Sequence, residues 1–182
     1  CAIRSNGSVS FPDAIGAAKS AFSNDDAACD IAFVACASHQ NQSESLCELS
    51  QLAHAGAAAF YFDRIVDNES LFEQALIAAD LIGLPIIFGP MTTLPNTKSH
   101  LNDGEVSFQI GLKGEPLLVE EQRIQYVLDM VNRHTRCPVH FQCVTSFRGL
   151  ELINQCKHTH SHHVSVGASA SHFVVSDDAC MS

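Results

Sequence analysis

Short apolar runs alternate with longer segments of helical periodicity along most of the 182 residues. Each run is apolar throughout rather than at every second position, which is typical of parallel strands covered on both faces. Strand and helix in regular order predict an α/β protein built on a parallel sheet or a barrel. The predicted strands are 30–36, 57–62, 85–88, 138–144 and 164–167, and the predicted helices are 11–22, 43–55, 70–82, 118–133 and 146–156.

Local signals mark the ends of two of these helices. Ser43 is a capping residue before the second helix, whose leucines recur three apart, and Gly56 follows its end. Ser70 and Glu73 have the spacing of a capping box at the start of the third helix, and Gly83 follows its last turn. Both helices should therefore end at glycines.

The formal net charge of −10 has the wrong sign for binding nucleic acid or an anionic membrane surface. No apolar run approaches the roughly 18–20 residues that span a bilayer, and we expect no secretory signal, because no basic segment followed by an apolar stretch occurs near residue 1. The eight cysteines are spread out and include no CxxC pair, so reduced thiols in the cytoplasm are expected. Cys36 and Cys143 fall inside predicted strands, where a thiol behaves as a small hydrophobic group.

Residues 91–116 interrupt the alternation with scattered Pro, Asn, Gly and Asp. Loops this long in a compact domain are usually functional or disordered. In a barrel of eight strands the active site lies on the loops that follow strands, and this segment follows the third predicted strand. Because such a barrel takes about 250 residues, residues 1–182 are expected to be a single-domain segment of a longer chain.

Four histidines occur between positions 158 and 163. They are either zinc or nickel ligands or a solvated connector between the last predicted helix and strand. Their position, opposite the usual active-site face of a barrel, favours the connector. His140 and Cys143 lie three apart on one predicted strand, so they should point to opposite faces and not pair as base and nucleophile. The sequence contains no phosphate-binding loop, dinucleotide fingerprint or serine elbow.

Two longer motifs resemble the dihydroorotase family. The first motif has three parts: residues 102–107 (NDGEVS), residues 111–116 (GLKGEP) and the acidic pair Glu120 and Glu121. In the same order, these parts resemble the family's G-x-V-S, its G-L-P-G-I-P and the acidic pair that opens the next helix. The second, 138–153, opens with PVHFQCVTS and resembles the family's V-H-x-x-H-V-S-T. Weaker similarities at 54–60, 83–88 and 164–178 extend the resemblance over 29–180.

This resemblance implies the central strands and helices of a (β/α)8 TIM-type amidohydrolase barrel. Family enzymes hydrolyse or close the dihydroorotate ring with zinc and a metal-activated hydroxide. By the resemblance, Tyr61 stands at the position of the carboxylated lysine ligand, Gly89 at the fifth-strand histidine and Cys143 at the sixth-strand histidine. We therefore expect no metal ligands, no catalytic residues and no cofactor in this segment.

The replaced ligands resemble those of non-catalytic dihydroorotase-like proteins that accompany the catalytic chain of aspartate carbamoyltransferase. This predicts a cytoplasmic pseudoenzyme of pyrimidine biosynthesis, working within a hetero-oligomer. One alternative is an active zinc-dependent cyclic-amide hydrolase with a divergent site that uses Cys143 and His172. The other is a fragment with no function of its own.

Overall fold

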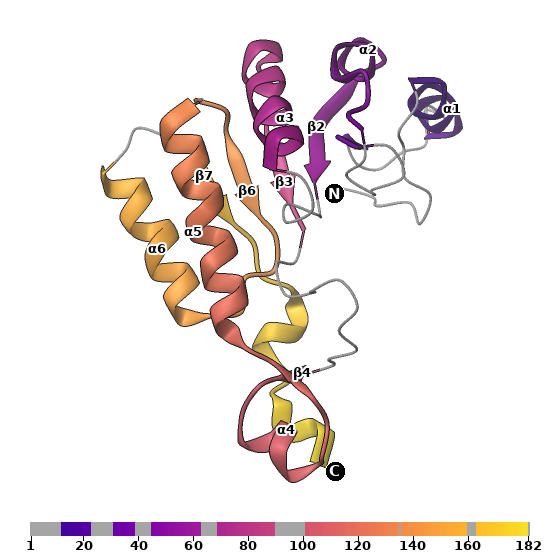
Figure 1. Cartoon of the computed structure of the whole chain (residues 1–182). Helices are drawn as coiled ribbons and strands as arrows, with labels where there is room; N and C mark the ends of the chain where they lie inside the picture. The colour runs from indigo at the N-terminus through magenta and orange to yellow at the C-terminus, as the bar shows by residue number, and fades with distance from the viewer. Residues whose placement is uncertain are drawn as a thin grey trace.

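The computed structural model describes residues 12–22, 31–38, 45–62, 69–89, 101–134, 136–159 and 163–181. Its centre is a parallel five-stranded sheet in the order β1-β2-β3-β6-β7 (Figure 1). The strands are β1 (Phe33–Cys36), β2 (Ala57–Phe62), β3 (Ile86–Phe88), β6 (Val139–Phe141) and β7 (Val164–Val166). All five predicted strands and their parallel arrangement are confirmed.

Helices connect successive strands and pack side by side as a layer on the sheet (Figure 1). They are α2 (Leu49–His54), α3 (Glu69–Ile82), α5 (Leu117–His134) and α6 (Phe147–Thr159), and α1 (Pro12–Phe22) lies beside α2. This mixed α/β architecture is consistent with part of an α/β barrel. In the part of the chain that the structure describes, no helix is both long and apolar enough to cross a membrane.

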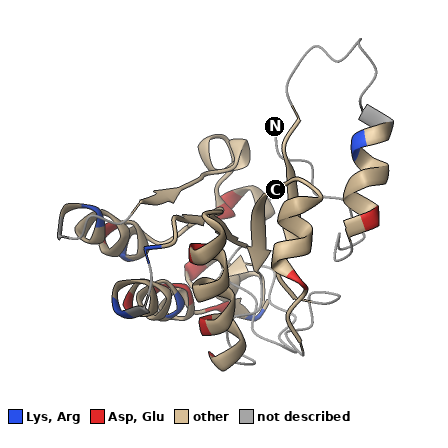
Figure 2. Cartoon of the chain, turned by 90° about the horizontal axis from the view of Figure 1, so that it is seen from above, with Lys and Arg blue, Asp and Glu red and all other residues tan. Residues whose placement is uncertain are grey.

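Aromatic rings form the core between the sheet and α3. Phe72 of α3 contacts Phe62 and Phe88 with ring centroids 5.5 and 5.4 Å apart, and Phe88 stacks on Phe141 at 5.6 Å. The strands of the main sheet carry no Asp, Glu, Lys or Arg, and Figure 2 places many of the coloured charges on the helices. Burial of these apolar strand residues against the helices therefore stabilises the sheet.

Because strand residues alternate between faces, a second row runs across the sheet on the other face. Register pairs Cys36 with Tyr61, Tyr61 with Ile87, Ile87 with His140, and His140 with Ser165. Side chains of this second row are the ones that could contact a ligand, because the helix-facing strand residues are part of the apolar core.

The second predicted helix is shorter than expected. Ser43 lies outside the described residues, and α2 begins only at Leu49. Leu46 instead forms an antiparallel bridge with Ser38, and the Cys47 N–H donates to the Ala37 carbonyl at 2.9 Å. Pairing with the chain beyond β1 thus replaces the first helical turn. The prediction that Gly56 and Gly83 follow helix ends is confirmed, with φ of 98° and 81°.

The second part of the predicted irregular segment is ordered. Residues 90–100 lie outside the described ranges, but β4 (Leu101–Asn102), α4 (Glu105–Gln109) and β5 (Gly114–Glu115) form a small unit with parallel strands. Gly114 allows the close approach of its neighbour, because a Cβ there would overlap the Asp103 backbone. Figure 1 shows this unit beyond the carboxyl end of the main sheet.

The C-terminal segment continues from β7 as two short 3-10 helices, η2 (Ala170–Phe173) and η3 (Asp177–Met181). The second of them contacts α4 (Figure 1). None of the six cysteines in the described ranges forms a disulfide. Burial raises the pKa of the Cys137 thiol to about 12, which keeps it protonated. A cytoplasmic location stays a prediction.

Candidate functional site

The three positions that the family resemblance assigns to metal ligands lie at the carboxyl ends of three neighbouring strands. Tyr61 is near the end of β2, Gly89 directly follows β3, and Cys143 comes two residues after β6. The Gly89 N–H donates to the Phe62 carbonyl at 3.2 Å, and the Cys143 N–H donates to the Gly167 carbonyl at 3.0 Å. Because parallel strands end at the same edge of a sheet, the fold gathers these positions along one rim.

Cys143 does not continue the strand as the sequence analysis expected. β6 ends at Phe141, and Cys143 has a φ of 58°, in the left-handed region that non-glycine residues rarely adopt. This turn leaves the thiol half-buried rather than in the core. The expectation that alternate strand residues point to opposite faces therefore holds for His140, which hydrogen-bonds Ser165. It does not hold for Cys143, because Cys143 lies beyond the end of the strand.

The donor chemistry along this rim does not fit a hydrolytic zinc centre. Such a centre takes three or more nitrogen, sulfur or carboxylate ligands held by rigid elements. Tyr61 offers a phenol, Gly89 offers no side-chain atom, and Cys143 offers one thiol. Among the residues that the structure describes, no three His, Cys, Asp or Glu side chains cluster closely enough to hold a metal ion.

Glu120 is a site residue that sequence reasoning recognised only as part of an acidic pair. Its side chain is 1% exposed, and it accepts hydrogen bonds from the Thr145 hydroxyl at 2.8 Å and the Ser146 N–H at 2.7 Å. The Thr145 N–H also donates to both carboxylate oxygens, at 3.0 and 3.2 Å. The carboxylate thereby ties the start of α5 to the segment that follows Cys143.

The Glu120 contact and a tight glycine together shape the first turn of α6. Ser146 accepts a hydrogen bond from the Gly149 N–H at 3.1 Å, as an N-cap residue does. A Cβ on Gly149 would come within 2.5 Å of the Ser146 hydroxyl and 2.7 Å of the Ile124 side chain. The motif residues Thr145, Ser146 and Gly149 therefore serve packing and capping at this rim.

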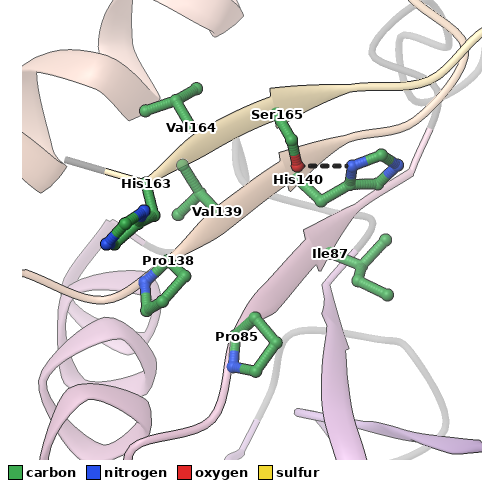
Figure 3. A pocket seen from close by; sticks show the side chains of 8 residues that line it. All are labelled: Pro85, Ile87, Pro138, Val139, His140, His163, Val164 and Ser165. Carbon is green, nitrogen blue, oxygen red and sulfur yellow. Dashed lines mark hydrogen bonds between the residues drawn. The ribbon is translucent and has the colours of Figure 1, made fainter. Parts of the chain in front are cut away.

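A polar pair lies further back on the same sheet face. His140 Nδ1 and the Ser165 hydroxyl are 2.8 Å apart, on adjacent strands (Figure 3). Desolvation lowers the pKa of His140, so its imidazole is neutral at pH 7. The pair borders a hollow of about 340 Å³ between Pro85, Pro138 and His163.

His158 lies in the last turn of α6 and His163 directly precedes β7, both at the end of the sheet opposite the carboxyl ends of the strands. His158 and His163 are exposed, whereas His160 and His162 fall outside the described residues. The choice between metal binding and a solvated connector stays a prediction. His172, the other histidine of the alternative hydrolase, is exposed on η2.

Comparison with known proteins gives no match to a family model but several related sequences. A "probable dihydroorotase-like protein" of Synechocystis is 29% identical over 117 residues, covering 64% of this chain and 26% of the relative. The dihydroorotase of Ruminiclostridium cellulolyticum is 30% identical over 138 residues, covering 75% and 32%. That of Pelobacter propionicus is 28% identical over 152 residues, covering 83% and 35%.

The fold defines a parallel α/β protein whose candidate site lies at the carboxyl ends of its strands. The names of these relatives support a relationship of this chain to the dihydroorotase family, in agreement with the sequence motifs. The chain spans only about a quarter to a third of the length of these relatives.

Proposed function

We propose that this chain is part of a catalytically inactive, dihydroorotase-like protein of pyrimidine biosynthesis that serves as a structural partner of aspartate carbamoyltransferase. The observation that carries the proposal is the set of side chains at Tyr61, Gly89 and Cys143. One thiol and one phenol on three neighbouring strand ends provide too few donors for a zinc-bound hydroxide. The similarity to relatives named dihydroorotase and dihydroorotase-like supplies the pathway.

The preserved interior supports a role based on shape. The strands on either side of the altered positions keep their apolar, helix-facing residues, and Phe60, Phe88 and Phe141 are fully buried. Selection for shape alone would leave such a core while the ligands are lost. Because a fold does not by itself fix a function, the partner must be tested directly.

The decisive experiment is to purify the full-length protein from its own cells and measure metal, activity and partner together. We expect no stoichiometric zinc, no turnover of dihydroorotate, and co-purification with the catalytic chain of aspartate carbamoyltransferase. Stoichiometric bound zinc together with turnover would contradict the inactive reading. An inactive protein that never associates with the transcarbamoylase would contradict the partnership alone.

A second candidate is an active cyclic-amide hydrolase with a divergent metal site. The half-buried Cys143 thiol at the rim and the exposed His172 beyond β7 are the observations in its favour. It predicts hydrolysis of dihydroorotate, hydantoin or allantoin after addition of Zn²⁺ or Mn²⁺, and loss of that activity in Cys143→Ser. Cys180→Ser is the matched control, because that thiol is exposed on η3. A background rate with all three substrates would eliminate this candidate.

A further inference from the structure

We draw no further inference here: the strongest candidate, the histidine cluster at 158–163 between α6 and β7, carries no metal-site proposal, because His160 and His162 lie outside the described residues and, among the residues that are described, no third potential ligand clusters with His158 and His163.

Discussion

Single buried polar residues determine the local structure at the rim where the carboxyl ends of the parallel strands lie. Glu120 and Thr145 are 25 positions apart in sequence, yet the Thr145 hydroxyl donates a hydrogen bond to the buried Glu120 carboxylate at 2.8 Å. A buried carboxylate is tolerated there because backbone and hydroxyl donors replace the lost water. Glu120 thus joins two motifs that the sequence presents as separate.

Replacing this carboxylate should weaken the fold. Glu120→Gln keeps one accepting oxygen but removes the negative charge, so the hydrogen bonds from the Thr145 and Ser146 N–H groups are no longer charge-assisted and weaken. We expect a loss of about 1–3 kcal/mol in the free energy of unfolding, measured by urea denaturation. Glu48→Gln, at an exposed position before α2, should change it by less than about 0.5 kcal/mol. Equal stability of the two variants would contradict the role of Glu120.

His140 should make stability depend on pH. Desolvation lowers its pKa in the folded state below the ordinary value of about 6.5, so between the two values the unfolded chain binds more protons. The stabilising contribution of the neutral imidazole is therefore present above about pH 6.5 and is lost as the pH falls toward the folded-state pKa.

Urea midpoints at about pH 7.5 and about pH 5.5 measure this dependence. The drop between them should be smaller in His140→Gln than in the wild type, whereas the exposed control His158→Gln should show the wild-type drop. A full wild-type drop in His140→Gln would contradict the assignment.

At the scale of elements, helix α6 depends on a close packing contact at its first turn. Gly149 lies against Ser146 and Ile124, and neither neighbour leaves room for a methyl group. The helix therefore approaches α5 closely, at the same place where Glu120 holds its start.

Two glycine substitutions separate packing from helix propensity. Gly149→Ala should destabilise the protein by about 1–3 kcal/mol, because the new methyl group displaces buried atoms. Gly16→Ala, in α1 with no atom near the position of its Cβ, should stabilise it by about 0.5–1 kcal/mol. Thermal melting curves of both variants measure the difference. A stabilising effect of Gly149→Ala would show that the contact is looser than the structure indicates.

At the scale of the whole molecule, the sheet has two edge strands, β1 and β7, and parallel sheets are usually covered on both faces. The described helices contribute to a core on one face, whereas the hollow opens on the other. The chain also spans only about a quarter to a third of its relatives. Residues outside this segment would therefore matter for its behaviour in solution.

This arrangement predicts how residues 1–182 behave when expressed alone. We expect self-association and a broad thermal transition, because unpaired edge strands recruit other chains. Light scattering after size-exclusion chromatography measures the association, and calorimetry measures the transition. A monomer with a sharp, cooperative transition would instead argue for an independent domain and against the fragment reading.

The sequence alone determined the order and type of the main elements, and the family resemblance set its three expected ligand positions, Tyr61, Gly89 and Cys143, at or near strand ends. Those features follow from periodicity and from residues adjacent in the chain, such as Gly56 and Gly83 after helices. Tertiary structure decided the rest, including the end of β6 before Cys143, the bonds of Glu120 and the pairing of His140 with Ser165. Each of these depends on atoms from distant parts of the chain, and no local pattern encodes which distant groups will meet.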